Sequence, residues 1–585
     1  MKKIPYGISN FETIIREGYY FVDKTMYIPK IEDKASYLFF MRPRRFGKSL
    51  FADMLEAYYD IEAKDKFDEL FGNLWIGSRP TEEANRYQVL RFDFSQTVAP
   101  LNRLYDTFNS YCCGIIDRFI SKYKKYYDQL AIDKVAATCD AGAKLNIIDS
   151  YAKWKTIPIY LIIDEYDNFT NVVLANEGKE EFHKLTHAEG FYRDFFKILK
   201  PMFRRIFLTG VSPVTMDDLT SGFNIAIDIS HMSKFNSMLG FSEQELRDML
   251  SYYKSRGAFA REVDDVLDEM RPWYNNYCFS NKCCGRESVY NSSMTMYYLG
   301  NLIDSDADSE EMLDRNTRTD HNKLRQLVQI DKQRKPGYRD SVIMEIANKG
   351  YLDMKLVESF PVMDIVDENN FRSLIYYYGM LTIQSVRGTL QRMVIPNQSV
   401  RLQYWDFILK EYAKVDTIDM GRLLNCFYTL AFDGDWKPLM RYLGDEYSRT
   451  SSVRDAIGGE HNVQGFVKAY LSMCDYHTFC PEIEMGYGYS DFLMIPQRSR
   501  FPEAVHSYII ETKYAKPSAP ESEVERLSAE ADAQLRRYLA DTKLIPLLKG
   551  TTVHPVKLVF HGPNLVVCEE KSPGPEPTGQ GSLWV

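Results

Sequence analysis

The sequence predicts an α/β protein with a parallel sheet in its front half and a second, smaller α/β domain near its end. Three observations lead to this prediction. An apolar run over residues 37–41 precedes a basic turn and Gly47-Lys48-Ser49. A second apolar run ends in Asp164-Glu165. Near the end of the chain, Asp491 and a Glu-x-Lys triplet at 511–513 lie on strand-like segments.

The composition is that of a globular chain. Its 585 residues leave room for roughly three to five domains, and 45% are hydrophobic and 26% charged. The net charge of −9 is not typical of a nucleic-acid-binding protein, although it allows a local basic groove. The first residues, MKKIPYGISNFE, lack the apolar core of a signal peptide, and no apolar run approaches the ~20 residues that span a bilayer. We therefore expect a cytoplasmic protein with no membrane contact.

Ten cysteines are scattered along the chain. They form no disulfide framework, which favours reduced thiols in a cytoplasmic protein. Cys278, Cys283 and Cys284 lie close together in the sequence, but no second pair of ligands follows at a useful spacing. We therefore expect no zinc site.

The stretch from 36 to 59 has the order strand, turn, GKS and helix that a phosphate-binding P-loop requires. In such a loop, backbone N–H groups at a helix N-terminus hold phosphate oxygens. Lys48 would reach the outer phosphates, and the hydroxyl of Ser49 would bind Mg²⁺. Arg42 stands where the pattern GxxxxGK[ST] has glycine, so the prediction depends on context. The alternative is a basic turn before a surface helix.

Residues 19–25 indicate a short strand and turn before a helix, which would pack near a nucleotide base or cap the sheet. Residues 87–95 predict a second strand with Asp93 at its polar end. Residues 100–153 predict two or three helices.

The run from 157 to 169 predicts a buried parallel strand that ends in carboxylates. Asp164 would hold Mg²⁺ through water, and Glu165 would orient and deprotonate the attacking water. Asp167 adds a third acid. The alternative is a strand that ends in a solvated acidic turn.

A helix at 181–199 and a strand at 204–213 should follow. Thr209, at the end of this strand, would sense the γ-phosphate or simply cap the strand. Arg204 and Arg205 precede it and would act on a neighbouring subunit's nucleotide in a homo-oligomer. A strand at 224–229 would complete a five-stranded parallel sheet.

Several spaced motifs resemble the AAA-ATPase-like family of bacterial proteins. The resemblance covers about residues 4–300, with the motifs FVDKT, RPRRFGKSL, LIIDEYDNF, LTGVSPV, GFSEQEL, RPWYNNYCF and VYN. These proteins are P-loop ATPases of the additional-strand type, usually with a C-terminal nuclease-like domain. Their loop resembles RPRRFGKT, so Arg42 agrees with the family pattern. The resemblance implies ATP binding and hydrolysis, with nucleotide contacts from Arg44, Arg45, Phe46, Gly47, Lys48, Ser49, Leu50 and Thr209.

The middle of the chain predicts a helical lid and a small connector of winged-helix type. Ser242 and Glu245 have the spacing of a capping box at the start of a helix. The aromatic turn at 273–279 is either buried packing, a nucleotide-sensing lid or a stacking surface for bases. Residues 374–383 look like a strand that pairs with 393–397.

Residues 480–496 predict a hairpin whose second strand begins at Asp491, and the strand at 507–516 contains Glu511-Thr512-Lys513. This is the PD-(D/E)XK nuclease arrangement. Alternation along the strand directs Glu511 and Lys513 to one side. Asp491 and Glu511 would share one or two Mg²⁺ ions, which activate water and neutralise the phosphodiester. Lys513 would position that water and stabilise developing charge.

The order of elements around these residues fits the same fold. A helix at 529–539 contains Gln534 and Tyr538, a closing strand follows at 556–562, and Glu460 lies where the first helix of the superfamily often supplies an acid. Family members tend to contain ExGxGRxD. The chain has EMGYGYSD, so Glu484, the two glycines and Asp491 match, while the arginine is missing. The alternative is a degenerate fold that binds without cutting.

The full prediction is an AAA-like P-loop ATPase domain at 1–235, a lid and connector at 236–420, a nuclease-like domain at 421–570 and a disordered tail at 571–585. Nucleotide state would control Mg²⁺-dependent cleavage of nucleic acid, with DNA favoured over RNA. One alternative is a signalling ATPase with a non-cleaving binding module. Another is an interaction protein with both sites decayed, against which the intact Lys48 and Asp164 argue.

Overall fold

The computed structural model describes residues 1–97, 101–168, 190–199, 201–214, 226–305, 312, 342–411, 419–450, 460–474, 476–485, 488–498, 501–542 and 544–571. The chain forms two compact units. The first, the front unit, consists of residues 1–317 and 353–397, and the second, the back unit, consists of 318–352 and 398–585. The proposed boundaries at 235 and 420 stay a prediction.

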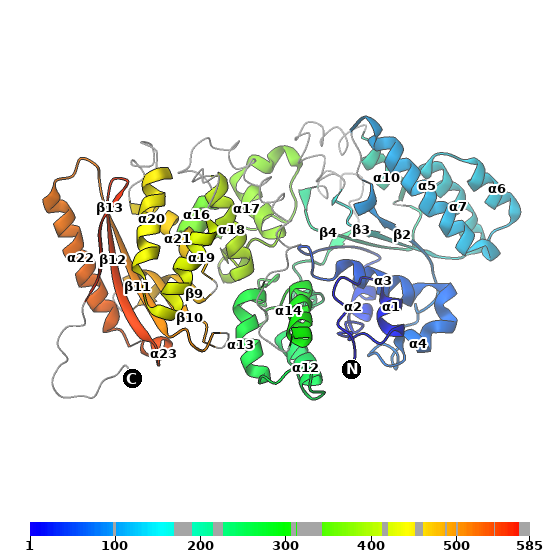
Figure 1. Cartoon of the computed structure of the whole chain (residues 1–585). Helices are drawn as coiled ribbons and strands as arrows, with labels where there is room; N and C mark the ends of the chain where they lie inside the picture. Colours follow the sequence, from blue (N-terminus) through cyan, green and yellow to red (C-terminus); the bar gives the residue numbers. More distant parts are fainter. Residues whose placement is uncertain are drawn as a thin grey trace. The chain divides into compact units, whose positions relative to one another are not determined.

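The front unit is built on a five-stranded parallel sheet with the order β2-β3-β4-β1-β5 (Figure 1). Its strands are β1 (Tyr37–Met41), β2 (Gln88–Asp93), β3 (Ile159–Asp164), β4 (Arg205–Gly210) and β5 (Ile227–Asp228). Every described pairing in it is parallel, which confirms the predicted α/β sheet. β3 is buried at all six positions because helices cover both faces of the sheet.

The strand register brings the carboxyl ends of the strands to one edge. Asp93 pairs with Asp164, and Phe40 pairs with Thr209. In parallel sheets ligands bind beyond this edge. The order of the strands therefore places the P-loop, the end of β3 and the end of β4 side by side.

Helices cover the two faces of this sheet (Figure 1). α3 (Lys48–Tyr59) packs against β2 and β3, and α5 (Leu104–Lys122) packs against β2. α6 (Gln129–Ala137) and α7 (Ala141–Lys155) follow α5, which confirms the helices predicted for 100–153, and α10 (Phe191–Leu199) packs against α7. The short helices before and after α3 are α1 (Phe11–Arg16), α2 (Tyr27–Glu32) and α4 (Phe67–Phe71).

Two strands predicted for this part differ in the structure. Residues 19–25 form no strand; Tyr19 makes only an isolated bridge to Lys3. The strand predicted at 224–229 is reduced to Ile227–Asp228 among the described residues. Part of the helix predicted at 181–199 lies outside the described residues.

Three helices of the lid region follow β5: α12 (Glu243–Lys254), α13 (Val263–Tyr274) and α14 (Ser292–Ser305). α12 begins at a complete capping box made by Ser242 and Glu245, as predicted. The aromatic turn behind α13 is buried packing, since Tyr277 and Phe279 are 5% and 4% exposed. Both rings stack edge-on against Phe46 of the P-loop.

The strand predicted at 374–383 was wrong in its first half. Residues Glu368–Tyr377 form helix α17, which starts at the N-cap Asp367. Phe371, Leu374 and Ile375 recur at helical spacing on its buried face. The strand β7 begins only at Thr382 (Thr382–Arg387) and pairs with β8 (Leu390–Val394), as expected for 393–397, and β6 (Tyr351–Met354) completes this small sheet.

The back unit contains a mixed sheet with the order β13-β12-β11-β10-β9. Its strands are β9 (His477–Met485), β10 (Gly488–Pro496), β11 (His506–Ala515), β12 (Thr552–His561) and β13 (Asn564–Glu570). β9 and β10 form the predicted hairpin, and β11 and β12 run parallel. Sequence analysis did not foresee β13, which pairs antiparallel with β12.

The helices of the back unit pack around this sheet. α22 (Glu521–Leu539) packs on β11 and β12, α21 (Glu460–Leu471) on β11, and α20 (Lys437–Thr450) on β13. The remaining helices are α16 (Val342–Lys349), α18 (Gln398–Glu411), α19 (Met420–Tyr428) and α23 (Ile545–Leu548). None of the helices in the described ranges is long and apolar enough to cross a membrane.

Candidate functional site

The P-loop turns sharply between β1 and α3. Arg45 and Gly47 have positive φ angles of 69° and 95°, and α3 starts directly afterwards at Lys48. The Nζ atom of Lys48 donates hydrogen bonds of 3.1 Å to the carbonyl oxygens of Arg42 and Pro43. Burial lowers the pKa of Lys48, while the carboxylates of Glu165 and Asp164 act in the opposite direction. A bound phosphate would compete with the two carbonyls for this ammonium group.

Arg42 has a structural role that the sequence did not reveal. Its side chain is 2% exposed, and its guanidinium donates to the carbonyl oxygens of Ser230 and Phe235 at 2.8 Å. It also lies over the rings of Phe40 and Phe279. Its cationic group is therefore directed to the segment behind β5.

The end of β3 forms the acidic wall of the site. Asp164 is 1% exposed, and the hydroxyl of Ser49 lies close enough to oppose the rise that burial causes in its pKa, so the structure brings together the two residues predicted to hold Mg²⁺. Burial raises the pKa of Asp164, and the same effect raises the pKa of Glu165 against the charge of Lys48. Glu165 has a φ of 50°, a strained backbone conformation of the kind found at functional sites.

Arg91 is a residue of this site that sequence analysis missed. It lies on β2, and its guanidinium donates to Asp53 at 2.6 Å and to the carbonyl oxygen of Ser49 at 3.3 Å. It also lies 3.9 Å from Asp164. The one available signal was its position on β2, two residues before Asp93 and near the carboxyl end of the strand.

The loop behind β4 is fixed by Asp167. Its carboxylate accepts hydrogen bonds from the backbone N–H groups of Val211 and Ser212, so this third acid braces the loop. Thr209 lies on β4 with 1% exposure, and its hydroxyl has no hydrogen-bond partner among the described residues. A buried hydroxyl without a partner at this edge fits the predicted sensor position.

The other predicted arginines differ in position. Arg44 donates to Asn168 at 3.1 Å, and its charge opposes the rise that burial causes in the pKa of Glu165, so it is near the acidic wall. The carbonyl oxygen of Arg45 accepts from the hydroxyl of Ser292, which ties the loop to α14. Arg204 and Arg205 lie at the amino end of β4, away from this edge, and Arg205 is paired with Glu83.

A small apolar recess of about 80 Å³ opens beside Gly47 and Leu50. Its walls come from residues 20–24, from residues 238–241, and from Ser292 and Met296 of α14. The N-terminal segment therefore lies beside the P-loop, as one of the two predictions for it required. Sequence analysis missed residues 238–241 and Ser292, although both lie in or beside the quoted family motifs GFSEQEL and VYN.

The second site lies in the back unit, where β10 and β11 pair. The register joins Phe492 to Ile510, so one step further Asp491 stands opposite Glu511. The backbone N–H of Thr512 donates to Asp491 at 2.8 Å. Lys513 Nζ donates to Glu511 at 2.9 Å and lies 3.5 Å from Glu460. The structure thus brings together the three predicted catalytic residues and Glu460.

Gln464 was not predicted, yet its Nε2 donates to Asp491 at 3.0 Å. It lies one helical turn after Glu460 on α21, and this i, i+4 spacing was the available signal. On α22, Tyr538 is buried, and the charges of Glu511 and Asp491 contribute to raising its pKa, so it is near the site. The buried Oε1 of Gln534 has no hydrogen-bond partner among the described residues. The side chain of Glu484 lies outside the described residues.

The donor set fits a divalent cation. Glu511 is 1% exposed, and its Oε2 has no hydrogen-bond partner in the described part of the chain. Burial raises the pKa of Asp491 and of Glu511, and the charge of Asp491 adds to the effect on Glu511. A buried carboxylate beside a partly buried one favours a cation between them. In the described ranges there is no group of three His, Cys, Asp or Glu side chains placed to hold a metal, so water and backbone oxygens would complete the shell.

Comparisons with known proteins find one family match in each unit. Residues 5–220 match the family model described as predicted AAA-ATPase, and residues 458–570 match that of the PD-(D/E)XK nuclease superfamily. The chain is also similar to an uncharacterized protein in the vnfD 5' region of Azotobacter chroococcum mcd 1, with 28% identity over 308 residues, 50% of each chain. The chain thus spans about half the length of this curated relative. Both matches agree with the families that the sequence motifs resemble.

Proposed function

We propose that the front unit binds and hydrolyses ATP with Mg²⁺ and that its nucleotide state controls a Mg²⁺-dependent nuclease in the back unit, with DNA as the favoured substrate. The observation that best supports the first activity is that Lys48, Ser49, Asp164 and Glu165 meet at one edge of the sheet. The second activity is supported by Asp491, Glu511 and Lys513, which meet where two strands pair.

In the front unit, the N-terminus of α3 and Gly47 present N–H groups to phosphate oxygens. Lys48 leaves the carbonyls of the loop and pairs with the outer phosphates. Ser49 and Asp164 hold the metal ion. Glu165 accepts the proton of the attacking water, and its raised pKa brings it closer to the neutral range in which a general base works.

In the back unit, Asp491 and Glu511 are the metal ligands, and Lys513 stands beside Glu511 to orient a water molecule and stabilise charge on the phosphodiester. In both units Mg²⁺, when bound, neutralises phosphate charge and lowers the pKa of water. Gln464 and the N–H of Thr512 hold the carboxylate of Asp491 in place.

The ATPase is tested by titrating ATP and Mg²⁺ into the full chain in a calorimeter. Lys48→Ala should abolish binding because the ammonium group that pairs with the phosphates is lost. Glu165→Gln should still bind ATP, but its rate of ATP hydrolysis, measured as phosphate release, should fall by about 10²-fold or more. Lys124→Ala, an exposed lysine far along the chain, is the control. Undiminished hydrolysis by Glu165→Gln would assign the base to another residue.

The nuclease is tested with Mg²⁺, with and without ATP, on single- and double-stranded DNA and RNA. Asp491→Asn and Lys513→Ala should each abolish cleavage, and Lys48→Ala should change only its dependence on ATP. If the two back-unit variants cut as well as wild type, the nuclease assignment is wrong. A chain that binds ATP but cuts none of the four substrates would instead be a nucleotide-gated binding module.

Metal binding has a readout that needs no nucleic acid. Mg²⁺ or Mn²⁺ should raise the unfolding temperature of the back unit, because a cation relieves the repulsion between the carboxylates of Asp491 and Glu511. Glu511→Gln should remove this shift, whereas Glu503→Gln, an exposed acid before β11, should keep it. An equal shift in both variants would place the metal elsewhere.

A further inference from the structure

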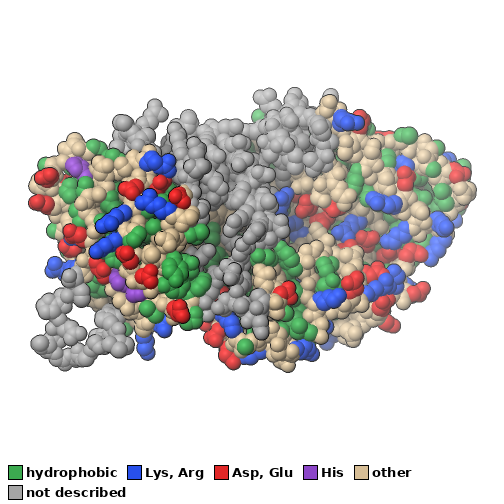
Figure 2. Space-filling model, in the orientation of Figure 1, with side chains coloured by type: hydrophobic (Ala, Val, Ile, Leu, Met, Phe, Trp, Pro, Cys, Tyr) green, Lys and Arg blue, Asp and Glu red, His purple; other side chains and the backbone are tan. Residues whose placement is uncertain are grey.

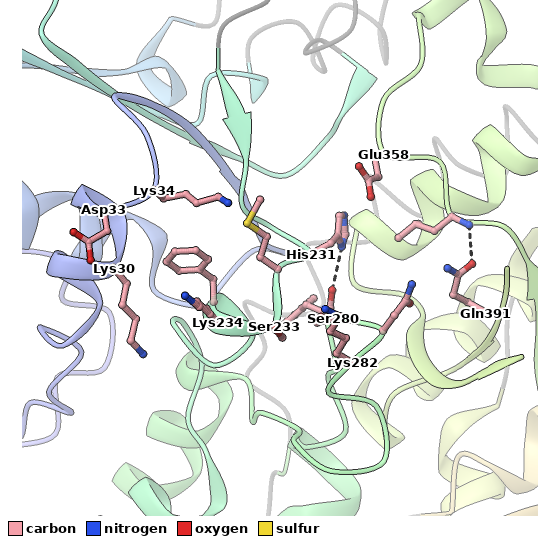
Figure 3. A pocket seen from close by; sticks show the side chains of 15 residues that line it. Lys30, Asp33, Lys34, His231, Ser233, Lys234, Ser280, Lys282, Glu358 and Gln391 are labelled. Carbon is pink, nitrogen blue, oxygen red and sulfur yellow. Dashed lines mark hydrogen bonds between the residues drawn. The ribbon is translucent and has the colours of Figure 1, made fainter. Parts of the chain in front are cut away.

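The front unit contains a larger pocket, whose lining includes no residue from 43 to 50 of the P-loop. It has a volume of about 560 Å³, in the range of small-ligand sites. Figure 3 shows Lys30 and Lys34 on one side and Glu358 and Gln391 on the other, with His231, Lys234 and Lys282 between them. Four lysines thus reach the pocket from three separate segments of the chain.

The charges of this pocket are unbalanced. Its lining includes four lysines (Lys30, Lys34, Lys234 and Lys282) but only two acids, Asp33 and Glu358. Within the described part of the chain, none of the four ammonium groups has an ion-pair partner; Lys30 lies over the ring of Tyr27. On the face drawn in Figure 2, by contrast, basic and acidic side chains are intermixed over the described surface, in keeping with the net charge of −9.

The walls of the pocket are held firmly. His231 uses both ring nitrogens, one with the carbonyl oxygen of Phe279 at 3.0 Å and one with the hydroxyl of Tyr377 at 2.8 Å. Gln391 is buried and accepts from the backbone N–H of Leu356 at 3.0 Å. The cationic side chains therefore project from a fixed frame.

We propose that this pocket is an anion site that binds the phosphate groups of a ligand. Lysines act as point charges toward phosphate, and a cluster of them without carboxylate partners gains most from a multiply charged anion. The lining contains no arginine, and its two phenylalanines are buried, so it offers charge rather than a platform for a base. The phosphates would come from the backbone of a nucleic-acid strand or from a small polyphosphate compound.

The pocket also has a physical connection to the P-loop. Phe235 and Phe279 form part of its lining, and the guanidinium of Arg42 binds the carbonyl of the first and covers the ring of the second. The frame of the anion site and the start of the P-loop therefore share one side chain. The proposal itself does not depend on ATPase or nuclease activity, because it concerns binding alone.

The site is tested by lysine acetylation of the full chain, read by mass spectrometry residue by residue, without Mg²⁺ so that no cleavage occurs. One arm contains a single-stranded oligothymidylate and the other contains inorganic tripolyphosphate. Lys30, Lys34, Lys234 and Lys282 should be protected in at least one arm, and the exposed lysines Lys64 and Lys124 should not. Protection by the oligonucleotide alone identifies a nucleic-acid strand, and protection by tripolyphosphate identifies a small phosphate compound.

A double variant provides the second measurement. Lys234→Ala with Lys282→Ala should weaken binding of the protecting anion, and for the oligonucleotide the slope of log affinity against log salt should fall by about 1.4. Lys64→Ala with Lys124→Ala, which removes the same charge, should leave both values unchanged, and ATP titration should be the same for both double variants. Protection no greater than that of Lys64 and Lys124 in either arm, or equal binding by the two double variants, would overturn the proposal.

Discussion

The side chain of Arg42 stands where the general P-loop pattern has glycine, and three of its hydrogen-bond acceptors lie 188 to 194 positions further along the chain. Sequence patterns predicted Lys48, Ser49, Asp164 and Glu165 because each follows a short apolar run that sets its place on a strand or helix. The same patterns could not predict Arg42 or Arg91, since the partners of these side chains are brought to them only by the strand order. Asp167 is the opposite case. Its place in an acidic run predicted a third acid of the site, whereas in the structure its carboxylate holds the loop behind β4.

Replacing Arg42 with glycine would restore the general pattern, yet we expect it to harm the protein. The change leaves the buried carbonyl oxygen of Ser230 without its donor and takes one of two donors from that of Phe235, which costs about 3 kcal/mol of the free energy of unfolding. Chemical denaturation and ATP titration would measure the two effects, and Arg42→Lys should recover only part of either. Unchanged stability in Arg42→Gly would show that the guanidinium contacts contribute little.

Among the elements, the predicted strand at 374–383 was wrong for a physical reason. Aromatic and branched residues such as Tyr376 and Ile375 favour strands in isolation. In the folded chain the cap at Asp367 and the helical spacing of the buried residues outweigh this preference. The hairpin of β9 and β10 was predicted from its sequence pattern, although β10 begins at Gly488 and not at Asp491.

The end of α17 is packed against the P-loop at Gly379. This residue has a φ of 79°, and a Cβ atom placed there would lie 2.7 Å from Cβ of Pro43. Gly379→Ala should therefore lower the free energy of unfolding by about 1–3 kcal/mol and weaken ATP binding. Gly388→Ala, also at positive φ but with open space around it, separates the backbone strain from the contact. Equal effects of the two variants would rule out a role of the Pro43 contact.

His477 at the start of β9 should make the back unit sensitive to acid. It is 2% exposed, and burial lowers its pKa from 6.5 to about 4. Between about pH 6.5 and pH 4, this histidine is therefore protonated in the unfolded chain but not in the folded chain. The free energy of unfolding falls by about 3 kcal/mol as the pH is lowered through this range. Denaturation at several pH values should show a smaller loss in His477→Gln, with the two proteins differing by a constant amount above pH 7. Identical pH slopes would contradict this assignment.

At the scale of the whole molecule, the front unit is discontinuous in the sequence. Residues 353–397 return to it after the chain has entered the back unit. They bring the hydroxyl of Thr382 to the N–H of Cys278 at 2.8 Å and the amide of Asn397 to the carbonyl of Asn275 at 3.0 Å. Residues 318–352 and 353–397 were both predicted to belong to the lid and connector. No local sequence pattern could show that the first joins the back unit and the second the front unit.

Shortened chains should reveal this arrangement. A fragment of residues 1–397 keeps every segment of the front unit, whereas residues 1–317 lack the returning segment. We expect the longer fragment to bind ATP and to unfold in a single transition, and the shorter one to unfold at a lower temperature with weaker binding. Calorimetry of both fragments measures this. Equal unfolding temperatures would mean that the returning segment adds no stability.

The path of the chain between the two units also has a consequence for inheritance. It passes from one unit to the other after residues 317, 352 and 397. A single recombination break in the gene between these points would divide one unit or the other, so neither can be exchanged whole by one crossover. The ATPase-like and nuclease-like parts are therefore expected to be passed on together, and to diverge as a pair.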